Sequence, residues 1–113
     1  MTVFTTPHAT ATDTEVFAAF ATGRVLRGDT ARVEPVNEHA GGIDTLTTLV
    51  LHGTPVALRV VGGYVFDSRQ YCCRVAAQMH QAREACGEGV VEMPHVAFRS
   101  LLAVLSVDLR GAR

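Results

Sequence analysis

The N-terminal part of the chain contains a short helical pattern, in which the apolar residues are Val16, Phe17, Phe20 and Ala21. Thr12 and Glu15 precede it at the spacing of a capping box, in which each side chain accepts a hydrogen bond from the other residue's backbone N–H. Gly23 suits the left-handed residue that ends a helix. We predict a helix of about ten residues here, which is too short to be stable without a packing partner.

The middle of the chain alternates apolar and polar residues between turn signals, which is typical of strands. We predict strands over residues 24–27, 31–36, 46–52, 55–61 and 64–66. Glycine-containing tight turns are predicted at Gly28-Asp29, Gly53-Thr54 and Gly62-Gly63, and a polar loop over residues 37–42. Pro35 confines its strand to an edge, or marks the end of that strand.

The clearest helical pattern follows these strands. Asp67 or Ser68 is the predicted N-cap, and Gly87 ends the helix. On a helical wheel, one apolar arc contains Tyr71, Cys72, Val75, Ala76, Met79, Ala82 and Cys86. We therefore predict a long amphipathic helix over residues 67–86 that covers one face of the sheet.

The last segment contains two competing patterns. Phe98, Leu101, Leu102, Leu105 and Leu109 recur at helical spacing after Pro94. The alternation from residue 105 to residue 110 favours a strand instead. We predict a helix over residues 95–108 because the helical pattern is the longer one, with a short strand at residues 90–93 before it.

These elements predict a single α+β domain over residues 1–113. It consists of a small antiparallel meander of four or five strands, covered by one long amphipathic helix, with shorter helices near both ends. Residues 1–11 are rich in Thr and Ala, and we expect them to fray or to add an edge strand through Val3 and Phe4.

Composition narrows the functional classes. The net charge is −1 and all ten basic residues are arginine, so no global positive field points to nucleic acid. The N-terminus has no apolar core of a secretory leader, and no apolar run approaches the roughly 20 residues of a membrane span. The three cysteines are clustered rather than spaced as a disulfide framework, so we expect a cytoplasmic protein.

The cysteines supply one candidate for chemistry. Cys72 and Cys86 lie on the apolar arc, where a thiol acts as a small apolar side chain. Cys73 lies off the arc near Arg69, and a neighbouring cation favours the reactive thiolate. Adjacent residues on a helix point about 100° apart, so Cys72 and Cys73 do not converge on one ion. We assign Cys73 as a candidate reactive thiol, and no catalytic residue, metal site or cofactor.

Arginines on the predicted strands are candidate nucleic-acid contacts. They are Arg24, Arg27, Arg32 and Arg59. If they share the exposed face of the sheet, they form a basic patch despite the nearly neutral total charge. Few aromatic residues stand between them, which weakens the hypothesis because single-stranded nucleic acids stack on aromatic rings.

The C-terminal segment supplies the candidate interface. As a helix it carries a second apolar stripe opposite its leucines, made by Val96, Ala103, Val104 and Val107. A helix that is apolar on two sides is buried on two sides, and a domain of this size has one core. The second stripe is therefore a candidate subunit interface. The alternatives are a central strand buried on both faces, or residues 37–43 covering the stripe.

The sequence favours a small non-catalytic interaction or regulatory module, a homodimer that also binds an unidentified protein by surface complementarity. One alternative is a nucleic-acid-binding regulator that uses the arginines. The other is a small enzyme or ligand-binding protein with a pocket between helix and sheet. No membrane association is expected.

Overall fold

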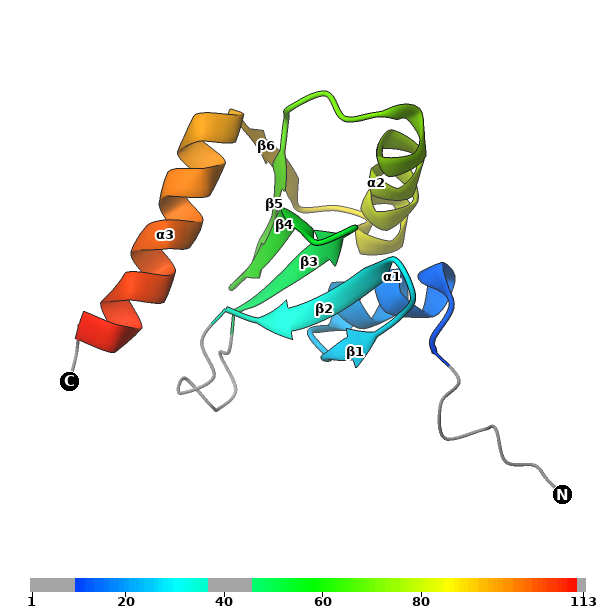
Figure 1. Cartoon of the computed structure of the whole chain (residues 1–113), viewed down its shortest axis with the longest axis horizontal. Helices are drawn as coiled ribbons and strands as arrows, with labels where there is room; N and C mark the ends of the chain where they lie inside the picture. Colours follow the sequence, from blue (N-terminus) through cyan, green and yellow to red (C-terminus); the bar gives the residue numbers. More distant parts are fainter. Residues whose placement is uncertain (1–9, 37–45, 112–113) are drawn as a thin grey trace, which may run out of the picture.

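The computed structural model describes residues 10–36 and 46–111, with side chains as far as residue 105. It has three layers (Figure 1). The helices α1 (Asp13–Thr22) and α2 (Cys73–Cys86) cover one face of a six-stranded sheet, and α3 (His95–Gly111) lies on the other face. The strands are β1 (Leu26–Arg27), β2 (Ala31–Pro35), β3 (Thr47–Leu51), β4 (Thr54–Val60), β5 (Gly63–Asp67) and β6 (Val90–Met93).

The strand order in the sheet follows the chain from β1 to β6. The strands β1 to β5 form the predicted antiparallel meander, but β6 pairs with β5 in parallel. The sheet is therefore mixed and has six strands, whereas four or five antiparallel strands were predicted. A parallel neighbour requires a crossover connection, which α2 provides. The pattern of residues 90–93 predicted a strand but carried no information on its direction.

The helices differ from prediction mainly at their ends. The capping box of α1 is confirmed, with the Glu15 N–H donating to Thr12 Oγ1 (3.2 Å) and the Thr12 N–H donating to Glu15 Oε1 (2.8 Å). In contrast, α2 begins at Cys73, because Asp67 ends β5 and a loop separates it from the helix. The helical prediction for the C-terminus is confirmed, but α3 has 17 residues and is longer than α2, not shorter.

Two hairpin turns lie one residue earlier than predicted. The turn between β3 and β4 is His52-Gly53, and both residues have positive φ (50° and 82°), as a type I′ turn requires. Thr54 instead begins β4, where it pairs with Leu51. Likewise, Gly62 takes the positive φ of the next turn while Gly63 already pairs with Val60. In each case a glycine with positive φ ends the turn.

The main core lies between the sheet and the helices α1 and α2. Its largest buried side chains include Phe17, Phe20, Leu49, Leu51, Val56 and Phe66. Three further buried apolar residues lie outside this cluster, on the side of α3: Val50, Leu58 and Phe98. Helices therefore pack on both faces of the sheet, α1 and α2 on one and α3 on the other.

The predicted apolar arc of α2 is only partly correct. Met79 and Ala82 are buried, but Cys72 and Ala76 are exposed. Gln78, placed off the arc, is buried instead. Its side-chain amide donates to Asp13 Oδ2 and Thr30 Oγ1 and lies 3.0 Å from the imidazole of His52. The late start of α2 explains the exposure of Cys72, which precedes the first turn. The hydrogen bonds of Gln78 explain why a polar residue is buried.

The cap of α1 can be tested with a matched pair of variants. Thr12→Ala removes the side chain that accepts from Glu15, and we expect the free energy of unfolding to fall by about 1 kcal/mol. Thr14→Ala, at an exposed position in the first turn, should leave it unchanged or slightly higher because Ala favours helix. Chemical denaturation measures both. Equal losses in the two variants would show that the cap does not stabilise α1.

Candidate functional site

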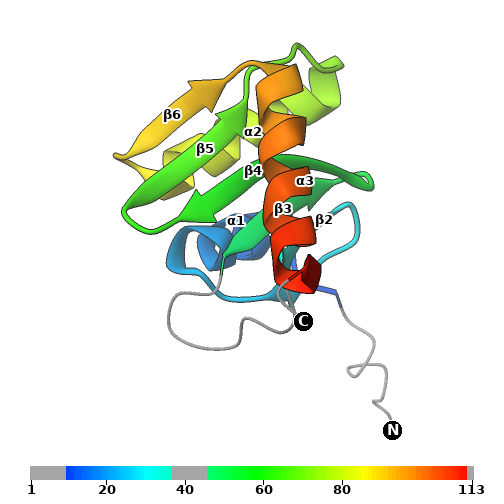
Figure 2. The ribbon, with the colours of Figure 1, turned by 90° about the vertical axis from the view of Figure 1, so that its left-hand side faces the viewer.

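The helix α3 has an inner face against the sheet and an outer face directed away from it (Figure 2). On the inner face Phe98 is completely buried, and Leu101, Leu102 and Leu105 are partly buried. On the outer face Val96 is 76% exposed, Val104 is 59% exposed and Ala103 is exposed. The predicted outer stripe is thus uncovered at these three residues.

Two parts of the interface prediction fall on residues whose side chains or positions the structure does not describe. Val107 belongs to α3, but its side chain is not among those that the structure describes. Residues 37–43, the alternative cover for the stripe, and the predicted strand at Val3 and Phe4 also lie outside the described residues. The interface therefore stays a prediction that rests on the exposed residues.

A buried carboxylate ties the beginning of α3 to the end of β5. The side chain of Asp67 has no exposed surface. Its Oδ2 accepts from Tyr71 Oη (2.7 Å) and pairs with His95 Nδ1 (2.7 Å), while its Oδ1 accepts from the Arg69 N–H (2.9 Å). One carboxylate thereby joins the last residue of β5, the loop before α2 and the first residue of α3.

The electrostatics of this cluster follow from its contacts. Burial by itself raises the pKa of Asp67, but the Arg69 N–H, the Tyr71 hydroxyl and His95 outweigh it, so the pKa lies below its usual value of 3.8. Burial and then the bond to Asp67 raise the pKa of Tyr71 to about 12. Asp67 is therefore a carboxylate, and Tyr71 donates to it, over the ordinary pH range.

The sequence pattern gave Asp67 a different role, that of a helix cap. Its partner His95 is 28 residues away and on the far side of the α2 crossover. No local pattern links them. The one available signal is that Asp67 directly follows the predicted strand at residues 64–66 and His95 comes two residues after the predicted strand at residues 90–93, because the carboxyl ends of parallel strands lie together. This signal can be used only if β6 is known to run parallel to β5.

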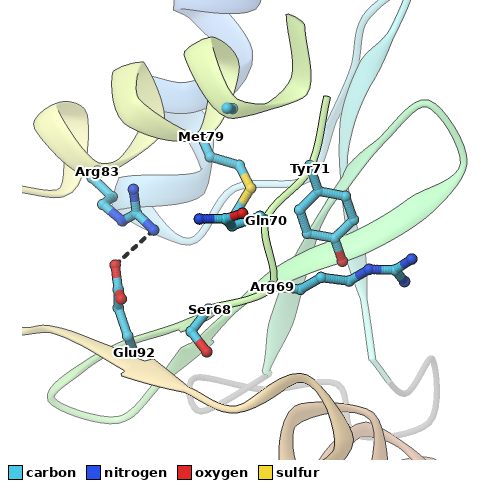
Figure 3. A pocket seen from close by; sticks show the side chains of 8 residues that line it. Ser68, Arg69, Gln70, Tyr71, Met79, Arg83 and Glu92 are labelled. Atoms are coloured by element: carbon cyan, nitrogen blue, oxygen red, sulfur yellow. Dashed lines mark ion pairs between the residues drawn. The ribbon is translucent and has the colours of Figure 1, made fainter. Parts of the chain in front are cut away.

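A cavity of about 390 Å³ lies between α2, the loop that precedes it and β6 (Figure 3). It is lined by Ser68, Arg69, Gln70, Tyr71, Ala76, Met79, Arg83 and Glu92. Arg83 and Glu92 face each other across one side of it, 2.7 Å apart, and the guanidinium of Arg83 lies over the Phe66 ring. Within the described ranges, no three His, Cys, Asp or Glu residues are grouped to hold a metal ion.

The three thiols have different surroundings. Cys73 is exposed, as predicted, and so is Cys72, which was expected in the core. Cys86 is partly buried, and burial raises its pKa to about 11 despite the nearby charge of Arg59. Only the two thiols at the beginning of α2 are thus open to solution chemistry.

The four candidate arginines do not lie on one face. Arg27 and Arg32 are directly opposite each other on β1 and β2, and Arg32 pairs with Glu34. Arg59 lies on the other face, with its guanidinium against Gly23 at the end of α1. Arg24 precedes β1 and donates to Thr22 Oγ1 (3.4 Å). The structure therefore brings two of the four together.

No protein-family model, curated protein or solved structure matches the chain. In the part of the chain that the structure describes, none of the helices combines the length and the apolar character that a bilayer crossing needs.

The role of Asp67 can be tested by Asp67→Asn. The variant keeps the size of the side chain but loses the charge, and we expect the free energy of unfolding at neutral pH to fall by about 1.5–3 kcal/mol, as for a hydrogen bond to a charged group. Because the pKa of Asp67 is lowered by folding, its stabilisation is present above the usual value of 3.8 and is lost as pH falls through the folded-state pKa.

Urea unfolding at a series of pH values measures this dependence. The difference between the wild type and Asp67→Asn should shrink in acid, whereas Asp29→Asn, at an exposed turn, should follow the wild type throughout. A difference between wild type and Asp67→Asn that stays constant down to strong acid would contradict the assignment.

Alkylation tests the surroundings of the thiols. At about pH 8, iodoacetamide should modify Cys72 and Cys73 quickly and Cys86 slowly, because burial and a raised pKa leave little accessible thiolate at Cys86. Peptide mass spectrometry over time identifies each site. In urea all three should react at similar rates, and fast modification of Cys86 without urea would be inconsistent with its position.

Proposed function

We propose that the protein is a non-catalytic interaction module that forms a homodimer through the outer face of α3. The observation that carries this proposal is the exposure of Val96 (76%) and Val104 (59%) on a helix whose opposite face already covers the sheet. Removing an exposed valine side chain from water contributes about 1.5–3 kcal/mol. When two copies cover each other's stripe, this free energy is gained at each valine of the stripe in both copies.

The spacing of the stripe supports a second copy as the partner. Three residues of the stripe, Val96, Ala103 and Val107, lie in line with Ser100 at intervals of four, three and four residues, and Val104 lies beside this line. This average of about 3.7 residues is close to the 3.6-residue turn of an α-helix, so the four residues lie along one side of α3. The residues are small and uncharged, so two helices can approach closely. An isologous contact places the same stripe on both sides.

Other functions receive less support from the described residues. A basic patch on the sheet lacks Arg59, which lies on the opposite face, and the charge of Arg32 is shared with Glu34. The cavity beside α2 is open, and its one ion pair links two residues of the chain itself. The free thiols fit a protein of a reducing compartment, and we place the module in the cytoplasm.

Val104→Glu tests the proposed homodimer. At low micromolar concentration the wild type should have about twice the mass of 12.1 kDa in light scattering, and the variant the mass of the single chain, because the glutamates would be desolvated in the interface. Val61→Glu changes a valine that is 77% exposed at the β4–β5 turn, and it should remain dimeric.

Both variants should keep the wild-type circular dichroism spectrum, since both side chains project into solvent in the single chain. A wild type that is monomeric at this concentration would exclude the proposal. So would a Val104→Glu variant that stays dimeric under these conditions. Capture of a different protein by the same stripe would assign the surface to a heterologous partner.

A further inference from the structure

The sheet has one edge that carries a complete, unpaired strand. The strand β6 is the last in the order of the sheet, and in the residues that the structure describes no strand pairs with its outer side (Figure 2). Val91, at its centre, is 59% exposed. An open edge presents a row of backbone donors and acceptors that can pair with another chain.

The ladder with β5 determines which groups face outward. The Tyr64 N–H donates to the carbonyl of Gly89 (2.9 Å), and the Ser68 N–H donates to that of Met93 (2.8 Å). In a parallel pair, alternate residues of a strand bond to the same neighbour. Residues 89, 91 and 93 therefore face β5. The N–H and C=O groups of Val90 and Glu92 point away from the sheet.

The opposite edge of the sheet, at β1, is protected, so β6 is the edge that is open to pairing. The strand β1 has two residues, and the Ala11 N–H donates to the carbonyl of Arg27 (3.3 Å), the last residue of β1. A very short edge strand covered by another segment is one of the usual protections of sheet edges. The strand β6 has four residues with no Pro and no bulge, which are other such protections, and its one charged side chain, Glu92, is paired with Arg83.

We propose that the β6 edges of two copies of this chain pair in an antiparallel fashion about a two-fold axis at Val91. In this register Val90 of one copy is opposite Glu92 of the other, and each such pair exchanges both N–H···O bonds. All the outward backbone groups of β6 are then used. The two Val91 residues form the central pair, whose Cα atoms are about 4.5 Å apart in this geometry.

The side chains fit this register and its symmetry. Val91 meets Val91, so a valine that is 59% exposed is covered by its own copy. Glu92 is opposite Val90 and not opposite the other Glu92, and its carboxylate is already paired with Arg83 of its own chain. An axis at Glu92 would place two glutamates face to face, which destabilises a strand pair. A second copy therefore complements the edge in length, polarity and charge.

This edge contact uses a different surface from the proposed α3 homodimer, and it should be weaker than that homodimer. Figure 2 shows α3 crossing the sheet away from β6, so an edge pair leaves the outer stripe of α3 free. Four residues per copy bury less than the roughly 1,200–2,000 Å² of a stable interface. The edge contact should therefore form only at high protein concentration, where it joins α3 dimers into larger assemblies.

Val104→Glu provides the background for the test, because it removes the proposed α3 contact without touching β6. We expect this protein to be monomeric at low micromolar and dimeric at near-millimolar concentration by sedimentation velocity. Over the same range the amide hydrogens of Val90 and Glu92 should exchange at least about tenfold more slowly, since pairing shields them. Those of exposed loops should not change.

Two pairs of variants in this background separate the edge from general effects. Val91→Lys should lower the association constant at least about tenfold, because two like charges would meet at the axis. Val25→Lys changes a valine with the same 59% exposure far from β6 and should have no effect. Glu92→Pro removes an outward N–H and should also prevent pairing, whereas Glu92→Ala, which keeps that N–H, should pair.

Thermal unfolding checks that each variant is folded; Val91→Lys is informative even if the proline variant is not stable. A Val104→Glu protein that stays monomeric at near-millimolar concentration overturns the proposal. So does equal association of the Val91→Lys and Val25→Lys proteins. If instead the wild type lacks the α3 dimer but the edge pair forms as described, only the proposed function fails.

Discussion

The carboxylate of Asp67 is the contact on which the C-terminal part of the fold depends. It accepts from the loop before α2, from Tyr71 and from the first residue of α3, and it has no exposed surface of its own. A buried carboxylate with these partners is stable only when all of them are in place. The direction in which α3 leaves β6 is therefore determined at one point, and Phe98 then packs the helix onto the sheet.

That arrangement leaves the molecule with an asymmetric distribution of apolar surface. The face under α1 and α2 is closed by a large core, including three phenylalanines. The face under α3 is closed by Phe98 and by partly buried leucines, and the same helix exposes valines on its other side. In the part of the chain that the structure describes, no element covers the outer side of this helix. The self-association that we propose rests on this exposure.

Much of the local structure could be predicted from the sequence. The capping box of Thr12 and Glu15, the left-handed Gly23 and the helical C-terminus depend on contacts within a few residues, and the strand at residues 90–93 was indicated by its local pattern. The start of α2 could not be predicted from such contacts. Asp67 and Ser68 are good caps, but Asp67 is also the last residue of β5, and tertiary hydrogen bonds decided between the two roles.

The sequence by itself determined the α+β class, the position of most elements and the two-sided apolar character of α3, because periodicity and capping are local properties. The tertiary structure alone decided the parallel direction of β6, the pairing of Asp67 with His95 and the burial of Gln78. It also separated Arg59 from Arg27 and Arg32. Each of these depends on which distant segments become neighbours, and a linear pattern contains no record of that choice.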